Sequence, residues 1–397
     1  MRYLFLGLMF DRDSEYEILK RSGYAQAQVN QYQWGFVDGF NSNMNLKIDI
    51  ISSIPMASFP IKSKKLFVKK NFVGSSYGID YVGYINFYVI RESVRKRAFY
   101  RKVRKYIEAS DDKVTVFVYS MYYPFLDVMR RIKNKFGDKV SYVLIVPDLV
   151  GEYTFSYKNK LKQAYHTRYA NKQMKYALFA DSYVLLTEKM KYPLNIGEKP
   201  YTVIEGFLPT CEFNYDNKRE RKTVLYTGSL NPAFGISALL KAFESITDPD
   251  YRLWICGAGD GQSEVEAAAE RDRRIIYKGF LPKSEIADLQ TRCDVLINPR
   301  PADGEYTKYS FPSKTMEYLL SGSKVVMHRL DGIGEEYYRF IRIIEEHTPD
   351  SIAKAITEAC DDVNFYDSRF MEQVEWIRGS KSSDEQVKKY LEKSYES

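Results

Sequence analysis

Short apolar runs alternate with amphipathic stretches along almost the whole chain. The runs rich in β-branched and aromatic residues predict buried strands at 2–8, 46–52, 84–90, 114–120, 141–146, 183–187 and 201–205, then at 223–227, 251–256, 274–277, 294–297, 324–327 and 342–344. Such alternation is typical of parallel sheets with helices on both faces. Because it restarts after residue 222, we expect an α/β protein with two doubly wound domains.

The chain length and the polar segments predict where these domains end. A chain of 397 residues favours two domains, or three, each large enough for its own core. We expect the boundary near 200–222, with the polar stretch 212–221 as the linker. After residue 380, Ser382-Ser383-Asp384 resembles a helix cap and predicts a final helix.

Residues 297–322 are the most informative for function, because they predict a strand end, a polar loop and then a helix. Pro312 suits the first helical position, and Gly322 suits the left-handed position that ends a helix. Ser313 and Glu317 share one face of this helix, while another face buries Met316, Leu319 and Leu320. Free N–H groups, a hydroxyl and a carboxylate together suit a phosphorylated ligand that also carries hydroxyls.

Glycine turns in the second half predict a further part of this site. Gly228, followed by Ser229, ends the strand 223–227, and Gly235 precedes the helix at 236–243. Small residues at such a turn let backbone N–H groups approach a pyrophosphate closely. The segment 257–261 has a second glycine turn, which by itself is weak evidence for a dinucleotide.

Three short motifs resemble the nucleotide-sugar loop of family 4 (group 1) retaining glycosyltransferases of the bacterial polysaccharide-biosynthesis type: Asn298-Pro299-Arg300, Tyr309-Ser310-Phe311 and Pro312-Ser313-Lys314. The resemblance implies a GT-B fold, in which two Rossmann-like domains face a central cleft. It implies an acceptor domain at 1–205, a nucleotide-sugar domain at 206–379, and a helix at 380–397 that returns to the first domain.

The resemblance also assigns roles. Glu317 corresponds to the second glutamate of the family's Glu-x7-Glu motif, which holds the nucleotide ribose, whereas the first glutamate is replaced by Tyr309. The family usually has an arginine and a lysine where this chain has Ser229 and Phe234. A diphosphate in a desolvated cleft needs opposing charge. The available cations are Arg300, Lys308 and Lys314, of which we favour Arg300 and Lys314; the alternative is that they are solvated surface charges.

The predicted site therefore has three groups of residues. The donor-binding residues are Gly228, Ser229, Tyr277, Lys278, Tyr309, Ser310, Ser313 and Glu317, of which Tyr277 and Lys278 resemble the family's base-pocket segment. The acceptor-side residues are Gly23 and Tyr24, which resemble the family's glycine loop. Asp148, with Arg300 and Lys314, is a catalytic candidate, because it follows a strand at 141–146 and could orient or deprotonate an acceptor hydroxyl. Capping or turn chemistry explains Asp148 equally well.

Neither a metal nor another cofactor is expected. Asp11-Arg12-Asp13 and Asp248-Pro249-Asp250 match Asp-x-Asp literally, but no second ligand set accompanies them. The four cysteines, Cys211, Cys256, Cys293 and Cys360, lack metal-type spacing and favour reduced thiols in a cytoplasmic protein. Single histidines such as His166 are more often structural.

The net charge of +7 is modest, but residues 91–107 concentrate eight basic residues against one acidic residue. Their apolar positions predict a basic amphipathic helix. One interpretation is a solvated helix packed on its sheet, and the other is attraction to anionic lipid on the inner face of the plasma membrane. Nucleic acid is disfavoured because no recognition motif accompanies the charge.

The favoured function is hexosyl transfer from a nucleoside diphosphate sugar to a glycan or lipid-linked glycan, with retention of configuration. One alternative is a nucleotide-sugar-binding protein that has lost catalysis, which predicts binding without turnover. A nucleotide-sugar epimerase on the same fold would act on the donor alone. The sequence does not choose the base, the sugar, the acceptor or the oligomeric state.

Overall fold

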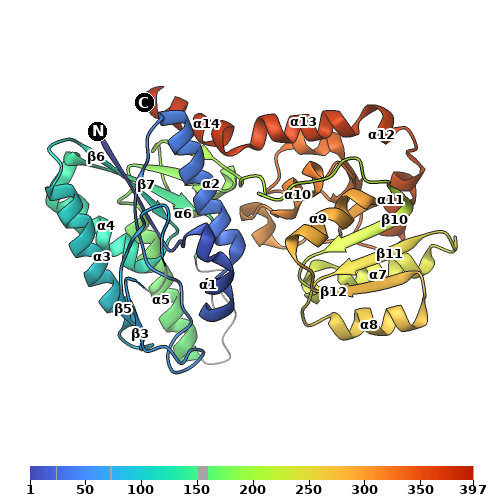
Figure 1. Ribbon diagram of the computed structural model, residues 1–397, viewed down its shortest axis with the longest axis horizontal. Coiled ribbons are helices and arrows are strands. Elements are labelled where there is room, and N and C mark those ends of the chain that lie inside the picture. Colours follow the sequence, from blue (N-terminus) through green and yellow to red (C-terminus); the bar gives the residue numbers. More distant parts are fainter. Residues whose placement is uncertain (24, 72–73, 151–159, 397) are drawn as a thin grey trace. The chain divides into compact units, whose positions relative to one another are not determined.

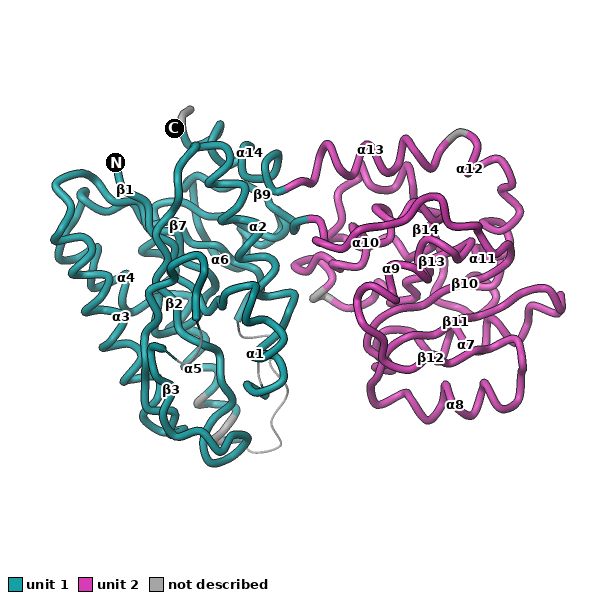
Figure 2. The backbone as a smooth tube through the Cα atoms, viewed as in Figure 1, with its two compact units in different colours: residues 1–207, 383–397 teal, residues 208–382 magenta. Residues whose placement is uncertain are grey.

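The computed structural model describes residues 1–23, 25–71, 74–150 and 160–396. The chain forms two compact units, one of residues 1–207 with 383–397 and the other of residues 208–382 (Figure 2). The family resemblance implies the corresponding limits at 205 and 379. Each unit has its own parallel sheet with helices on both faces, so the predicted pair of doubly wound Rossmann-like domains is confirmed (Figure 1).

The first unit is built on a parallel sheet of strand order β4-β2-β1-β6-β7-β8-β9. Its strands are β1 (Arg2–Gly7), β2 (Asp49–Ser52), β4 (Asp80–Tyr81), β6 (Val114–Tyr119), β7 (Val140–Val146), β8 (Ser182–Leu185) and β9 (Tyr201–Val203). A small antiparallel ladder pairs β3 (Phe67–Val68) with β5 (Tyr84–Ile85). The helices are α1 (Glu15–Ser22), α2 (Ala27–Met44), α3 (Arg91–Glu108), α4 (Tyr123–Phe136), α5 (Lys160–Ala177), α6 (Lys191–Leu194) and α14 (Ser383–Glu396).

The second unit has a parallel sheet of order β12-β11-β10-β13-β14-β15, the strand order of a dinucleotide-binding Rossmann sheet. Its strands are β10 (Glu220–Thr227), β11 (Arg252–Cys256), β12 (Ile275–Gly279), β13 (Cys293–Asn298), β14 (Lys324–His328) and β15 (Ile341–Ile344). The helices are α7 (Ile236–Ser245), α8 (Gln262–Arg271), α9 (Lys283–Arg292), α10 (Lys314–Leu320), α11 (Pro349–Asp361), α12 (Phe365–Ser368) and α13 (Phe370–Lys381).

Amphipathic patterning explains how the helices attach to the sheets. In α3 the side chains of Phe99, Val103 and Ile107, spaced by four positions, are buried in the first unit. The final helix α14 packs on α2, and its Gln386 Nε2 donates to Glu205 Oε2 at 3.1 Å. Gly39 of α2 permits this approach, because a Cβ there would lie 2.1 Å from the carbonyl oxygen of Ser383.

Three local predictions were wrong. The apolar run 84–90 forms a strand only at Tyr84–Ile85, and residues 88–90 are an exposed turn. The stretch 212–221 is not the linker, because β10 already begins at Glu220 and the Tyr215 hydroxyl donates to the Leu320 carbonyl at 2.7 Å within the second unit. Pro312 is not the first helical residue, because α10 begins at Lys314, and Ser313 makes no side-chain cap bond.

Candidate functional site

The predicted donor residues gather at the carboxyl edge of the second sheet. Chain connectivity reverses direction between β10 and β13, and parallel sheets bind ligands where such a reversal leaves a crevice. Gly228 directly follows β10, and Arg300 follows β13 by two residues. The loops after these neighbouring strands therefore lie at one edge, as the sequence predicts.

Close backbone packing explains the glycines of these loops. The Gly228 N–H donates to the Cys256 carbonyl at 3.0 Å, and a Cβ on Gly257 would lie 1.8 Å from the Gly228 carbonyl oxygen. Gly235 has φ +83°, and its Cβ would lie 2.2 Å from the Pro299 carbonyl oxygen. Only glycine fits such contacts, so the turns after β10, β11 and β13 pack backbone against backbone.

Glu317 is the centre of a polar network in this unit. Its carboxylate accepts from Gln290 Nε2 at 2.7 Å and from Lys314 Nζ at 2.9 and 3.0 Å, and its side chain is 21% exposed. Gln290 is fully buried on α9, and its Nε2 also lies 3.5 Å from Thr227 Oγ1 at the end of β10. A half-buried carboxylate held by two donors has a fixed direction and still reaches solvent, which suits recognition of hydroxyl groups.

The buried side of α10 anchors this network to β10. The Tyr318 hydroxyl is 3.1 Å from Thr227 Oγ1, accepts from the Thr227 N–H at 3.1 Å and donates to the Thr227 carbonyl at 3.1 Å. Gly322 has φ +73° and ends the helix in the left-handed region, as predicted. The position of Glu317 is thus set by the helix, by α9 and by the central strand together.

Arg300 lies beside two of the other predicted residues. Its guanidinium donates to Ser310 Oγ at 3.3 Å, and its Cζ is 5.5 Å from the centroid of the Phe234 ring. Phe234, which replaces a basic residue of the resembled family, therefore packs next to a cation supplied from the loop after β13. Ser313 is exposed at the start of α10, and Tyr309 ends a short 3₁₀ helix, Glu305–Tyr309.

Tyr277 and Lys278 point in different directions, because neighbouring residues of a strand face opposite sides of the sheet. The Tyr277 hydroxyl donates to the Gly257 carbonyl at 2.9 Å, whereas Lys278 Nζ lies 4.6 Å from the Trp254 ring centroid. Burial raises the pKa of the Cys256 thiol to about 11, and the charges of Lys278 and Lys314 oppose that rise. Lys278 and Lys314 are therefore both near the Cys256 thiol.

Two site neighbours were missed by sequence reasoning. Gln290 carries a weak signal, because it is a polar residue on the buried side of an otherwise amphipathic helix. The sequence gives no signal that Cys211 belongs to the site. Burial raises the pKa of its thiol, the Glu317 carboxylate raises it further, and the charges of Lys283 and Lys314 oppose the rise. Cys211 therefore lies close to the Glu317 network.

The acceptor-side predictions fall in the first unit. Gly23 ends α1 with φ +62°, and a Cβ there would lie 3.7 Å from the Lys62 carbonyl oxygen; Tyr24 lies outside the described residues. Asp148 follows β7 and has access to solvent, yet the surrounding protein desolvates its carboxyl and raises its pKa. Burial raises the pKa of Tyr119 at the end of β6, and the charge of Asp148 raises it further, so the two groups are neighbours.

Within the described ranges, no cluster of three or more His, Cys, Asp or Glu side chains could hold a metal ion, and no helix is long and apolar enough to cross a membrane. All four cysteines are free, as predicted. His328 is buried, with Nδ1 3.1 Å from the Ile344 carbonyl oxygen, which is a structural contact.

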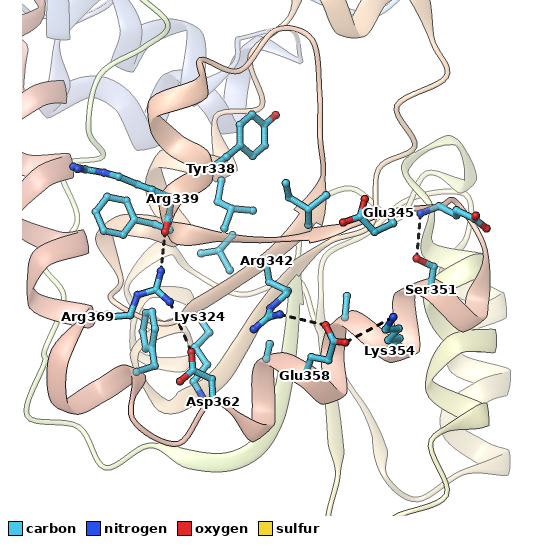
Figure 3. A pocket seen from close by; sticks show the side chains of 18 of the residues that line it. Lys324, Tyr338, Arg339, Arg342, Glu345, Ser351, Lys354, Glu358, Asp362 and Arg369 are labelled. Atoms are coloured by element: carbon cyan, nitrogen blue, oxygen red, sulfur yellow. Dashed lines mark hydrogen bonds and ion pairs between the residues drawn. The ribbon is translucent and has the colours of Figure 1, made fainter.

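A cavity of about 850 Å³ lies elsewhere in the second unit, at the edge strand β15 and helix α11 (Figure 3). Two ion pairs lie in its wall: Arg342 is 3.2 Å from Glu358, and Arg369 is 3.9 Å from Asp362. None of the predicted donor residues lines it. Gly228, Ser229 and Ser310 lie instead in the segments that follow β10 and β13.

Comparison with known proteins agrees with this geometry. Residues 221–362 match the family model described as "Glycosyl transferases group 1". No curated protein sequence matches the chain significantly.

Solved structures that resemble the chain over almost its full length share the fold. HepE from Anabaena, solved with UDP, has a TM-score of 0.64 at 12% identity, covering 99% of this chain and 100% of that one. TarM of S. aureus has a TM-score of 0.64 at 10% identity, covering 99% and 98%. Sucrose-phosphate synthase from Thermosynechococcus elongatus has a TM-score of 0.60 at 14% identity, covering 100% and 99%.

Proposed function

We propose, from the premise that this chain is a group 1 glycosyltransferase of the GT-B fold, that it transfers a hexose from a nucleoside diphosphate sugar to a glycan or lipid-linked glycan with retention of configuration. One observation carries the proposal. The Glu317 carboxylate is held by Gln290 and Lys314 beside the crevice where Rossmann sheets bind nucleotides.

The donor would bind with its ribose at Glu317, because a carboxylate with fixed direction accepts hydrogen bonds from vicinal hydroxyls. Arg300, next to Ser310, would neutralise the diphosphate together with Lys314. The backbone at Gly228 and Ser229 would approach the phosphates closely, since no side chain intervenes at the glycine. Stabilising the departing diphosphate and positioning the acceptor would supply most of the rate.

Further residues would refine recognition of the donor. Ser313 and Tyr309 would contribute hydroxyls near the phosphates, while Tyr277 and Lys278 would contribute on the base side of the crevice. Two neighbours, HepE of Anabaena and the pneumococcal O-GlcNAc transferase GtfA, were solved with UDP. UDP-sugars are therefore the first donors to test, and we expect turnover without an added metal ion.

The acceptor would bind in the first unit, with Gly23 and Tyr24 on the acceptor side and Asp148 as the residue that orients or deprotonates its hydroxyl. The raised pKa of Asp148 supports this role, because a carboxylate whose pKa lies nearer to neutral pH is a better general base. We place the enzyme in bacterial polysaccharide biosynthesis, on the cytoplasmic side and peripherally on the membrane, where lipid-linked acceptors reside.

The test uses the whole chain with UDP-, GDP-, ADP- and dTDP-sugars, following thermal stabilisation and release of free nucleotide together. A donor at 100 times its Kd should stabilise the fold by about 2.7 kcal/mol. Glu317→Gln should abolish that stabilisation, whereas the exposed control Glu335→Gln should retain it. Wild-type donor affinity in Glu317→Gln would refute the assignment of the ribose site.

Ser229 and Phe234 favour one competing function, a nucleotide-sugar-binding protein without catalysis, because both replace cations of the family. That protein would be stabilised by a donor and release no nucleotide, even with a preparation of lipid-linked glycans. Transfer of labelled sugar to such glycans would exclude it.

A further inference from the structure

An exposed apolar and basic surface covers part of the first unit that the catalytic assignment does not use. Five large apolar residues between positions 61 and 90 are more than 40% exposed: Ile61 (65%), Phe67 (61%), Tyr88 (51%), Val89 (61%) and Ile90 (41%). Single exposed apolar residues are ordinary, but three in succession and a local cluster are signs of an interaction surface.

Lysines surround these apolar side chains. Residues 61–70 contain five lysines, all exposed, and no acidic residue occurs from position 59 to position 79. We name the exposed side chains of Ile61, Phe67, Tyr88, Val89 and Ile90, together with Lys62, Lys64, Lys65, Lys69 and Lys70, the 61–90 patch. Apolar anchors within a basic rim are typical of proteins that lie on a membrane surface.

The backbone of the patch is well supported. Asn86 is fully buried, and its Nδ2 donates to the Ala57 carbonyl at 2.7 Å and to the Lys65 carbonyl at 2.9 Å. The Tyr88 N–H donates to the Phe59 carbonyl at 3.1 Å. The segments near 59, 65 and 88 are thus tied together beside the start of α3, as Figure 1 shows for β3 and β5.

Helix α3 contributes less charge than its sequence suggests. Five of its eight basic residues are engaged within the unit: Arg91 with Glu92, Lys96 with Asp127, Lys102 with Asp80, Arg104 with Glu108, and Arg95 with the Ile54 carbonyl. Arg97, Arg101 and Lys105 are exposed at four-residue spacing and have no acidic partner among the described residues. They form a basic row along one side of the helix.

We propose that the 61–90 patch docks the enzyme on an anionic membrane surface, with its apolar side chains in the headgroup region and its lysines against the lipid phosphates. Charge selects this occupant, because a second copy would place five lysines against five lysines. Nucleic acid would leave Ile61, Val89 and Ile90 in water.

The patch also adjoins the acceptor side, because the carbonyl of Lys62 lies beside Gly23. Docking would bring the acceptor side close to lipid-linked glycans, a consequence that rests on the proposed function, whereas membrane binding itself does not.

Vesicle sedimentation of the full chain tests the proposal, with phosphatidylcholine alone and mixed with phosphatidylglycerol, at low and high salt. The charge variant is Lys64→Gln, Lys65→Gln and Lys69→Gln, and its control carries the same change at exposed Lys218, Lys241 and Lys354. Each lysine near an anionic surface contributes roughly a fivefold factor, so the charge variant should partition about 100-fold more weakly onto mixed vesicles. Its control should bind like wild type.

The apolar variant is Ile61→Ser, Phe67→Ser and Val89→Ser, and its control is Tyr192→Ser, Phe280→Ser and Val363→Ser, at 71%, 82% and 54% exposure. The apolar variant should bind mixed vesicles weakly, through its lysines alone. High salt should remove this remaining binding, because salt screens the attraction between the lysines and the lipid phosphates. Circular dichroism spectra matching wild type would show that the variants are folded.

Equal binding of either variant and its control would overturn the proposal. So would a chain that stays in the supernatant with every vesicle, or self-association that Phe67→Ser abolishes, which would assign the patch to a second copy. Nucleotide release measured without vesicles keeps the two proposals apart. Vesicle binding without release would leave the docking surface intact and count against the transferase.

Discussion

Gln290→Leu tests whether the Glu317 network exists to bind a ligand. Gln290 Nε2 donates to Glu317 Oε1 at 2.7 Å, and a hydrogen bond to a charged group contributes about 1.5 to 3 kcal/mol. Lys314 still holds the carboxylate after the substitution, but one of the two elements that orient it is lost. The ligand must then order a carboxylate that this bond no longer fixes, and a cost of about 2 kcal/mol for that ordering raises the Kd for the nucleoside diphosphate by a factor of about 30.

The same substitution should change stability little. Gln290 is fully buried, and its Oε1 has no hydrogen-bond partner among the described residues, so leucine removes a desolvated polar atom and keeps similar volume. Glu317 remains 21% exposed and can be hydrated. We expect the free energy of unfolding to stay within about 1 kcal/mol of wild type.

Gln373→Leu is the matched control. Gln373 is also fully buried in the second unit, but its Nε2 donates to the carbonyls of Leu319 and Ser323, at 2.8 and 3.1 Å, rather than to Glu317. Losing these bonds should destabilise the fold by about 1 to 3 kcal/mol and leave the affinity of the folded protein unchanged. Isothermal titration and urea unfolding measure both quantities. Donor affinity of Gln290→Leu within twofold of wild type would refute the reasoning.

Three further outcomes are expected. Gly235→Ala should lower the free energy of unfolding by about 2 kcal/mol or more in urea titration, because φ is +83° and the new Cβ would lie 2.2 Å from the Pro299 carbonyl oxygen; unchanged stability would contradict the packing of these turns. Arg300→Gln should lower kcat by a factor of about 10 to 100, measured as nucleotide release, because it removes a cation from the diphosphate; a full rate would assign that charge to another residue. Burial, and secondarily the charge of His347, lowers the pKa of His328 to about 4. The free energy of unfolding should therefore be unaffected by this group above pH 6.5, and it should fall by up to about 3 kcal/mol as the pH drops towards 4 and the buried ring gains a proton. His328→Gln should flatten this part of the stability–pH curve.

Sequence reasoning succeeded where the signal was local. The strands of both sheets other than β4, the helix α3 and the glycine end of α10 follow from periodicity and capping over a few neighbouring residues. It failed at 84–90, because a short apolar run predicts a buried strand from sequence alone, and the sequence does not show whether those side chains pack in a core or remain exposed. The two-residue strands β3 and β4 are too short to show a period at all.

The sequence by itself determined the two doubly wound sheets and the turn glycines, because each depends on patterns within short segments. Only the tertiary structure decided that Gln290, on a different helix, donates to Glu317 and that Phe234 packs beside Arg300. Those pairs are brought together by strand order, which no local pattern encodes. Likewise, only folding shows that Lys96 and Lys102 of α3 pair with the distant carboxylates of Asp127 and Asp80, while the lysines of 61–70 remain exposed.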